Sequence, residues 1–576
     1  MKQVKISLFI IFIIFLTFSE SLIACEDDQT VKDKQSDNKP KEKSDPQQAD
    51  EEKIEAQVEK LYERNKEQIL KKINEVAVTN GLKGKALERF KKQTEKQVKD
   101  TIRAQLVSKE DAEEDNSNDT EYEDKAPSDE NKETDDEEIT EVKSRLFLKA
   151  NEVLEKLIGI RGLKKKRDVE ISPMTRNELY DYLSGEFDKD IIDSDNKMDD
   201  LINARLGFQP EGVDTKEVML KMLKQGVAGF YDPKTKKYYL IQKKNSTKFN
   251  EATIAHELVH ALQDQYYDLM KLPVEIHGNS DVGAALKCVI EGDAKFAELA
   301  YMKKYLGKNE DKEWLESDIG GQGIYMAKKP GGMYIDYKKA GMSKEQFFGM
   351  FIGKILMYPY FEGARFVNAV HKKGGWDAVN HLYEDWPLST EQIIHPEKFL
   401  DPAKRDDPTE IDAKDFIDWL DNKYDYVNSD VIGERGIDLL LINFLPRNVV
   451  DAEVAGAGWE GDRFVGFVNN ENNQPSYVWM SLWETEKDAQ EFAEAMTKFY
   501  QKRFGKPSDE KKVPDTVVAA KDNIVSWVER QGKKVIICDG ESLEASKTLL
   551  KQALNKSKIK ETISSSFWSV EKEVAK

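Results

Sequence analysis

The residues most able to do chemistry in this 576-residue chain are His256, Glu257 and His260, which form the pattern His-Glu-x-x-His. On an α-helix, residues four apart lie on one face, so both imidazoles can reach a single metal ion. Zinc binds imidazole nitrogens, and a catalytic zinc site keeps one position open for water. From its place beside the first ligand, Glu257 can reach that zinc-bound water and act as its base. The pattern predicts a zinc site; the simpler alternative is two histidines packing or capping a surface helix.

A third protein ligand must come from elsewhere in the chain. Metzincins place a Gly and a third His shortly after the motif, where this chain has Gln263 and Tyr266, so that class is excluded. His277 is a possible but poor ligand in a short loop. Glu291 lies in an apolar, small-residue stretch typical of a buried helix, where a carboxylate is costly unless it is paired or metal-bound. Glu291 therefore favours the His₂Glu site of gluzincins; the alternative is a capping or salt-bridged carboxylate in a helix kinked at Gly292.

Two aspartates are candidates for orienting the histidines, because a metal-bound His usually donates its second N–H to a carboxylate or carbonyl. Asp293 follows Glu291 closely, and Asp264 lies one turn beyond His260. We expect Asp293 to take this role before Asp264. A surface or capping Asp is the alternative for each.

A further histidine, His395, lies far from the motif in residues 387–398. Ser389 or Thr390 can cap a short helix there, and Pro396 would set its end. His395 could donate a proton or a hydrogen bond to the developing oxyanion of peptide hydrolysis. The alternative is a structural His that holds the turn before Pro396.

The elements that must position these residues follow from sequence periodicity and turn signals. The pattern predicts a hairpin over residues 226–241, around an Asp-Pro-x-Thr turn, and the metal helix over 250–268. An extended substrate could add to an edge strand of this hairpin, unless the hairpin is only structural. Further helices are expected over residues 142–157, 175–183, 199–206, from 358 to about 373–375, and 376–383.

Five stretches together resemble a group of prokaryotic His-Glu-x-x-His proteins of the gluzincin-like zinc metallopeptidase type, over roughly residues 140–570. These stretches are His-Glu-Leu-Val-His-Ala-Leu-Gln-Asp-Gln from His256, Glu-Gly-Asp-Ala from Glu291, Ser-Thr-Glu-Gln-Ile-Ile-His-Pro-Glu-Lys from Ser389, Gly-Phe-Tyr-Asp from Gly229, and Gly-Gly-Trp from Gly374. The resemblance implies zincin-like architecture, with three zinc ligands and a base: His256, His260, Glu291 and Glu257. It also implies that His395 and Glu391 are site residues, and it supplies no substrate.

The start of the chain reads as a targeting segment. Lys2 and Lys5 precede an apolar run that ends in Leu-Ile-Ala-Cys at Cys25, which resembles the bacterial lipobox. Residues 1–25 are therefore expected to be a lipoprotein signal peptide with Cys25 lipidated; the alternative is an uncleaved membrane anchor. Either way the bulk of the chain would lie outside the cytoplasm, in the cell envelope. The remaining cysteines, Cys288 and Cys538, are expected to be buried free thiols.

Three further segments precede the globular part. Residues 26–50 are polar and predict a disordered tether, whereas 51–107 repeat apolar residues at helical spacing. The second segment could be a coiled-coil spacer that docks a partner protein, or a solvated helix with no partner. Residues 108–138 are strongly acidic and predict a disordered linker. The net charge of −20 argues against nucleic acid as a partner.

The expected fold class is α+β: a mainly helical zincin-like domain over residues 139–406, then a small α+β domain over 407–576. In the second domain the pattern predicts the order β-β-α-β-β-α. Strands are expected over 463–468, 476–483, 523–529 and 534–538, and helices over 487–504 and 543–554; a further helix or buried element is expected over 431–444.

The sequence thus predicts a membrane-tethered zinc metallopeptidase that hydrolyses peptide bonds by Glu-assisted attack of a zinc-bound water. The rival interpretation is a non-catalytic envelope lipoprotein with a structural zinc site and a partner-binding helical region. A zinc hydrolase acting on something other than peptide is a third possibility, because the metal chemistry is shared.

Overall fold

The computed structural model describes residues 130–560 except for 191–192, 242–249, 277, 309–340, 418–422, 446–449, 508–515, 522–523 and 541–558. The predicted signal peptide, tether, 51–107 helices, most of the acidic linker, the final helix over 543–554 and His277 lie outside the described residues. By compactness the chain divides into one unit of Met1–Asp27 with Ile139–Lys576, and another of Asp28–Glu138. No helix of the described ranges is both long and apolar enough to cross a bilayer.

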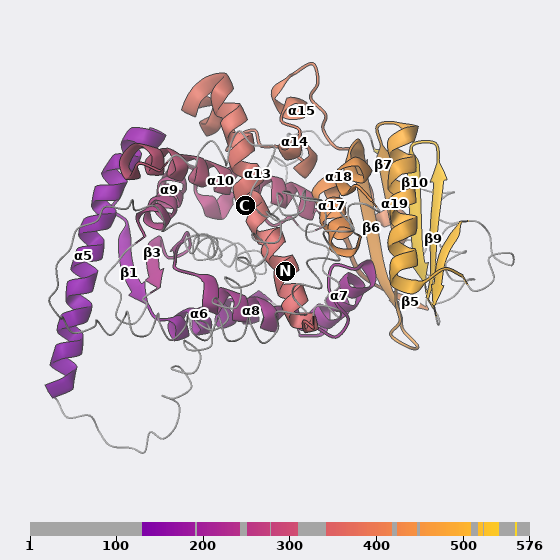
Figure 1. Ribbon diagram of the computed structural model, residues 1–576, viewed down its shortest axis with the longest axis horizontal. Helices are drawn as coiled ribbons and strands as arrows, with labels where there is room; N and C mark the ends of the chain where they lie inside the picture. The colour runs from indigo at the N-terminus through magenta and orange to yellow at the C-terminus, as the bar shows by residue number, and fades with distance from the viewer. Residues whose placement is uncertain are drawn as a thin grey trace, which may run out of the picture. The chain divides into compact units, whose positions relative to one another are not determined.

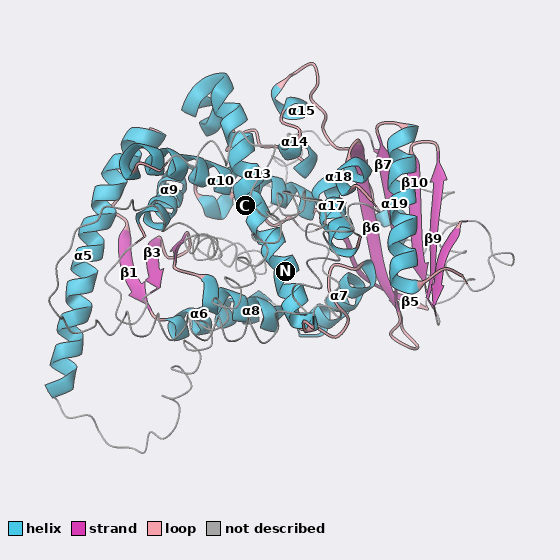
Figure 2. Ribbon diagram, in the orientation of Figure 1, coloured by secondary structure: helices cyan, strands magenta, loops and turns pink. Residues whose placement is uncertain are grey.

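The described chain opens with a helical layer and a small sheet (Figures 1 and 2). The elements are α5 (Glu130–Arg161), β1 (Glu170–Met174), α6 (Arg176–Asp190), α7 (Asp193–Leu206), α8 (Thr215–Gly226), β2 (Gly229–Asp232) and β3 (Lys237–Ile241). The predicted hairpin is present, because β2 pairs antiparallel with β3. The sequence missed β1, which pairs parallel with β3 and completes a sheet of order β1-β3-β2. This order leaves β2 at an edge.

The next helices carry the motif and the Glu291 segment. They are α9 (Glu251–Tyr267), α10 (Ser280–Tyr301), α13 (Lys344–His381), α14 (Thr390–Ile394) and α15 (Glu397–Leu400), with short 3₁₀ and π turns after α9 and α10 at Leu269–Lys271 and Met302–Leu306. Asparagine side chains cap α9 and α10 at their N-termini by accepting a backbone N–H. As expected, Ser389 caps α14.

Helix α13 differs from the expectation of two helices beginning at residue 358. It begins at Lys344, after a capping box in which Ser343 and Gln346 exchange side-chain and backbone hydrogen bonds. The two expected helices follow one another directly, separated by a kink at Gly374 and Gly375. Gly375 has a φ of 64°, a conformation that glycine adopts without the penalty other residues pay.

Helices α10 and α13 approach closely at two glycines. A Cβ added to Gly292 would lie 2.2 Å from the carbonyl carbon of Gly363, and one added to Gly363 would lie 2.2 Å from the carbonyl oxygen of Cys288. No side chain fits at either position, so Gly292 allows helix contact and does not mark a kink. The close crossing brings the α13 aromatic Tyr360 against the histidines of α9.

The C-terminal region is a six-stranded antiparallel sheet of order β5-β6-β7-β10-β9-β8 with helices packed on it. Its elements are β4 (Glu410–Ile411), α16 (Lys414–Ile417), β5 (Tyr424–Asp430), α17 (Gly433–Phe444), α18 (Ala452–Gly456), β6 (Trp459–Asn469), β7 (Pro475–Trp483), α19 (Glu486–Phe504), β8 (Val517–Lys521), β9 (Ile524–Gln531), β10 (Lys534–Gly540) and β11 (Ile559–Lys560). The predicted strands and the helix over 487–504 are present, and 431–444 is helical. The sequence missed the two edge strands β5 and β8.

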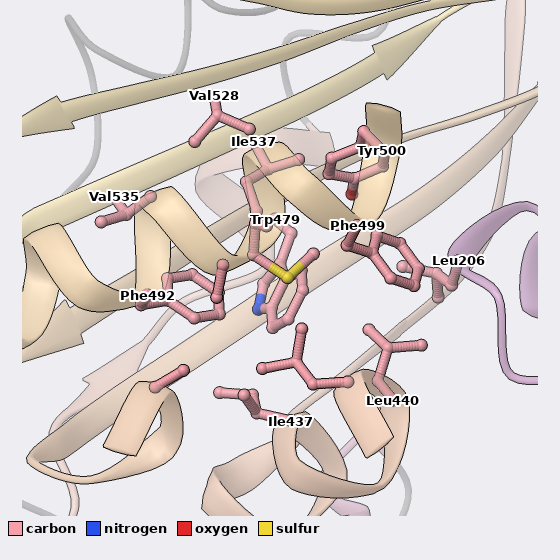
Figure 3. Packing of buried hydrophobic residues seen from close by; sticks show 14 of the residues in the cluster. Leu206, Ile437, Leu440, Trp479, Phe492, Phe499, Tyr500, Val528, Val535 and Ile537 are labelled. Atoms are coloured by element: carbon pink, nitrogen blue, oxygen red, sulfur yellow. The ribbon is translucent and has the colours of Figure 1, made fainter. Parts of the chain in front are cut away.

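The core of this region lies between the sheet and its helices. Trp479, Phe492, Phe499 and Ile537 are buried and pack together with residues of α17, as the close view in Figure 3 shows. Aromatic burial of this kind contributes most of the stabilising free energy of such a layer. The fold is therefore α+β, a helical region followed by a sheet region.

Candidate functional site

Three ligand atoms from two helices converge inside the helical region. His256 Nε2 lies 3.1 Å from His260 Nε2 and 3.4 Å from Glu291 Oε2, and His260 Nε2 lies 3.3 Å from Glu291 Oε2. All three side chains are buried. The helical spacing on α9 aligns the two imidazoles, and α10 packs beside α9 to bring the carboxylate. The structure thus brings together the three residues that the sequence predicted as ligands, and together they could hold a metal ion.

The second ring nitrogen of each histidine has its own acceptor. His256 Nδ1 lies 3.0 Å from Glu298 Oε2, and His260 Nδ1 lies 2.8 Å from Gln263 Oε1. Glu298 is in turn held by the Lys295 ammonium at 2.7 Å. Since these acceptors take the Nδ1 protons, the Nε2 lone pairs point into the cluster, where a cation could bind them.

The expectation that Asp293 or Asp264 would accept these protons directly is wrong. Asp293 is buried against Arg161, with oxygen–nitrogen distances of 2.6 and 3.0 Å, and it reaches His260 only through Gln263. Asp264 accepts from the Tyr231 hydroxyl at 2.8 Å and forms ion pairs with basic side chains outside α9. Both aspartates face away from the imidazoles because the α9 and α10 surfaces nearest the rings are occupied by Gln263 and Glu298.

Glu257 lies among these charges with one oxygen unpaired. Its Oε2 atom accepts the Tyr231 backbone N–H of β2 at 2.8 Å, whereas Oε1 is buried with no hydrogen-bond partner among the described residues. Burial raises the pKa of Glu257 to about 7, although the two histidines act to lower it. A carboxyl with a pKa near neutrality can both take and give a proton at physiological pH.

The cluster as a whole attracts positive charge. Burial lowers the pKa of His256, but hydrogen bonds from Glu291 and Glu298 outweigh it and raise that pKa to about 10. Burial acts to raise the pKa of Glu291, and the neighbouring histidines reverse this, so that it is lowered overall. Glu291 Oε1 is buried without a partner among the described residues. Carboxylates so placed demand a cation, which can be a proton on an imidazole or a metal ion.

Sequence reasoning missed Tyr360, on the neighbouring turn of α13. Its ring stacks on His256 with a centroid distance of 5.6 Å and an interplanar angle of 24°. Its hydroxyl is buried with no hydrogen-bond partner among the described residues. Burial and the negative charges of Glu291 and Glu257 raise the pKa of Tyr360 well above its usual value, so the hydroxyl keeps its proton and can donate it to a hydrogen bond. Only the helix crossing could reveal this residue, because its spacing from the motif carries no signal.

His395 does not join this cluster. Its Nε2 atom donates to Glu434 Oε1 of α17 at 3.1 Å, and within the described residues no hydrogen bond or ion pair links it to the motif. Glu391 is likewise engaged elsewhere, with Lys398 at 2.7 Å. The structural alternative for His395 therefore fits the observed contacts, and the proposed contact with an oxyanion does not.

Residues 387–398 instead connect the helical region to the sheet region. Thr390 donates through its backbone N–H and its hydroxyl to Asp281 of α10. The Lys398 ammonium binds Glu391, Asp406 and Glu484, three carboxylates whose oxygens lie close enough together to suggest a second metal site. Because Lys398 already supplies a positive charge at their centre, these carboxylates need no metal ion.

Comparisons with known proteins give one match, outside this cluster. A family model described as a domain of unknown function, DUF8575, matches residues 422–550, the sheet region from just before β5. No curated protein and no solved structure matches the chain significantly.

Proposed function

We propose that this protein is a zinc-dependent metallopeptidase of gluzincin-like type. The observation that carries the proposal is the convergence of His256 Nε2, His260 Nε2 and Glu291 Oε2, 3.1 to 3.4 Å apart. Zinc–ligand bonds of about 2.0–2.1 Å at tetrahedral angles separate ligand atoms by about 3.3–3.4 Å. The donor set therefore fits zinc, and the buried, unpartnered Glu291 Oε1 fits a site that needs a cation.

A bound zinc would polarise the scissile carbonyl and lower the pKa of its water. Glu257 would take a proton on Oε1 from the attacking water and pass it to the leaving amine. Its Oε2 is fixed by the Tyr231 N–H, so the carboxylate keeps its orientation while Oε1 stays free. The Tyr360 hydroxyl would donate a hydrogen bond to the developing oxyanion, the role that the sequence had suggested for His395.

Peptide is the substrate class that the surroundings favour. Strand β2 lies at the edge of its sheet and packs against α9. The backbone N–H of Tyr231 points from this edge at Glu257 and not at another strand. An extended peptide added along the edge would pass beside that carboxylate, and main-chain hydrogen bonds would hold it there.

The rival interpretation, a structural zinc site in a non-catalytic lipoprotein, is less well supported. Structural zinc sites have four protein ligands, whereas catalytic ones have three and an open position. Within the described residues the cluster offers three ligand side chains, with the Glu257 carboxylate beside them. The donor set thus favours chemistry over a purely structural role.

The location of the enzyme is also a proposal. The segment ending in Cys25 and the polar stretch after it would tether the protein to the outside of a bacterial membrane, with residues 51–107 available to a partner protein. Detergent phase partitioning of wild type and Cys25→Ala tests this. We expect the wild type in the detergent phase and the variant in the aqueous phase; equal partitioning would contradict lipidation.

The central experiment measures zinc content and peptide cleavage together. Wild type should bind about one zinc per chain, because three ligands build one site. It should cleave members of a proteome-derived peptide library, stop with a chelator and recover with added zinc. A His256→Ala, His260→Ala double variant should lose both properties, whereas His381→Ala, on the exposed end of α13, should keep them. Unchanged zinc content in the double variant would refute the site, and zinc binding without any cleavage would favour the structural alternative.

A further inference from the structure

The Gln263 side chain lies between the motif and a buried ion pair. Its Oε1 atom is 2.8 Å from His260 Nδ1, and its Nε2 atom is 3.0 Å from both the Ile290 carbonyl oxygen and Asp293 Oδ2. Gln263 is fully buried, so no solvent competes for these contacts. All three positions of the amide therefore have a defined partner.

These partners permit only one orientation of the amide. The Ile290 carbonyl accepts hydrogen bonds only, and so does an ionised Asp293 carboxylate, so both must face the NH₂ group. A flipped amide would place an oxygen 3.0 Å from two other oxygens and leave a buried NH₂ facing the imidazole. Such an arrangement costs the desolvation of each unpaired group, about 1–3 kcal/mol apiece.

Asp293 is itself held in place. Arg161 pairs with both of its oxygens, and the Tyr383 hydroxyl donates to Oδ2 at 2.8 Å. Arg161 and Asp293 are both fully buried. The last residue of α5 therefore fixes the carboxylate that fixes the Gln263 amide.

We propose that Gln263 is a positioning residue that fixes His260 in the Nδ1–H tautomer. With Oε1 as the only group facing Nδ1, the imidazole must carry its proton there, and its Nε2 lone pair then points at His256 and Glu291. This proposal rests on the proposed metal site for its consequence, but the tautomer is a property of the protein itself.

His256 and His260 would thus be held by groups of different charge. His256 is held by the Glu298 carboxylate and His260 by a neutral amide. A carboxylate makes the imidazole it binds more basic, whereas an amide orients it without adding charge. The site gains a correctly directed second nitrogen without a fourth buried carboxylate beside Glu257, Glu291 and Glu298.

The decisive measurement is the tautomer of His260 in metal-free protein labelled with ¹⁵N and ¹³C at histidine. The chain has only 6 His, so the signals can be assigned by substitution. We expect the wild type to show Nδ1–H at His260. An Nε2–H tautomer in folded wild type would overturn the proposal without any variant being needed.

Zinc affinity gives a second readout, by competition with a chromophoric chelator. Gln263→Leu removes the acceptor and should release the tautomer and weaken zinc binding about 10- to 100-fold. Gln263→Glu keeps an acceptor oxygen, so it should keep the Nδ1–H tautomer and bind zinc more tightly than Gln263→Leu does. Gln490→Leu, at an exposed glutamine on α19, is the matched control and should behave as wild type.

The outcomes separate this proposal from the proposed function. Absence of zinc binding in wild type that shows the Nδ1–H tautomer would refute the metal site and leave the role of Gln263 intact. Zinc affinity and tautomer both unchanged in a folded Gln263→Leu variant would refute the role of Gln263 and leave the metal site intact. If Gln263→Leu fails to fold, the wild-type tautomer and the Gln263→Glu variant still decide the question.

Discussion

Buried carboxylates are satisfied in the sheet region and left partly unsatisfied in the helical region. Asp462 accepts three N–H groups, from Ile432, Gly433 and the Trp459 indole, and Asp539 accepts from Arg205 and Ser526 through its two oxygens. By contrast, Glu257 and Glu291 each keep one buried oxygen with no partner among the described residues. A buried acceptor left unpaired costs about 1–3 kcal/mol, and more when it is charged.

This difference indicates what each region is built for. In the sheet region the carboxylates tie strands and helices together, so their charges are used up by the fold. In the helical region the fold brings two carboxylates and two imidazoles together without completing their hydrogen bonds. Such an incomplete arrangement is stabilised when a cation binds, which is why the helical region is the candidate site and the sheet region is not.

The sharpest test exchanges one carboxylate of each kind for its amide. Glu257→Gln should lower kcat by about 10² to 10⁴, because the amide cannot take the proton, while zinc content and stability stay near wild type. Asp462→Asn should do the opposite and lower the free energy of unfolding by about 1–3 kcal/mol, because its NH₂ group would face N–H donors. Peptide cleavage, zinc content and urea unfolding measure the three effects. Full activity in a zinc-loaded Glu257→Gln enzyme would contradict its role as base and make Glu391 the next carboxylate to test.

Two buried arginines make the same comparison with positive charges. Arg161→Met and Arg205→Met each leave a buried aspartate unpaired, so each should lower the free energy of unfolding by about 3–5 kcal/mol. Only Arg161→Met should also weaken zinc binding, because Asp293 holds Gln263 and through it His260. Denaturant unfolding and zinc competition on the same preparations check this. Equal zinc affinities in the two variants would show that the Arg161 network does not reach the metal site.

A third test concerns the unpartnered hydroxyl of the helical region. Tyr360→Phe keeps the ring on His256 and removes only the donor, so kcat should fall about 10²- to 10³-fold with KM and zinc content nearly unchanged. Tyr358→Phe, two residues away with a hydroxyl that is also buried and unpartnered among the described residues, is the matched control. Steady-state kinetics with a cleaved peptide measure both. Equal losses in the two variants would indicate a packing effect.

The smallest effect is expected where the two regions meet, at His395. Its hydrogen bond to Glu434 raises the pKa of His395, although burial opposes this. A raised folded-state pKa gives stability that is present below the unfolded pKa of about 6.5 and is lost as the pH rises through the folded value. His395→Gln should therefore destabilise the protein more at pH 6 than at pH 9, with kcat/KM lowered less than about tenfold. A loss of 10²-fold or more would restore His395 to the catalytic machinery.

The sequence alone determined the local features of this protein. Helical spacing placed His256 and His260 on one face, and a carboxylate in an apolar stretch pointed to Glu291; the structure brings all three together. The hairpin before the metal helix and the central strands of the sheet could also be predicted, because alternation and turn residues are local signals.

Only the tertiary structure decided which side chains surround these groups. Glu298 and Gln263, not Asp293 and Asp264, face the imidazoles, because the packing of α10 on α9 selects residues by position around the helix and not by nearness in sequence. Tyr360 reaches His256 because Gly292 and Gly363 let two helices touch, and His395 is turned to Glu434 by the docking of α14 on α17. Contacts of this kind depend on how whole elements pack, and no short stretch of sequence encodes that packing.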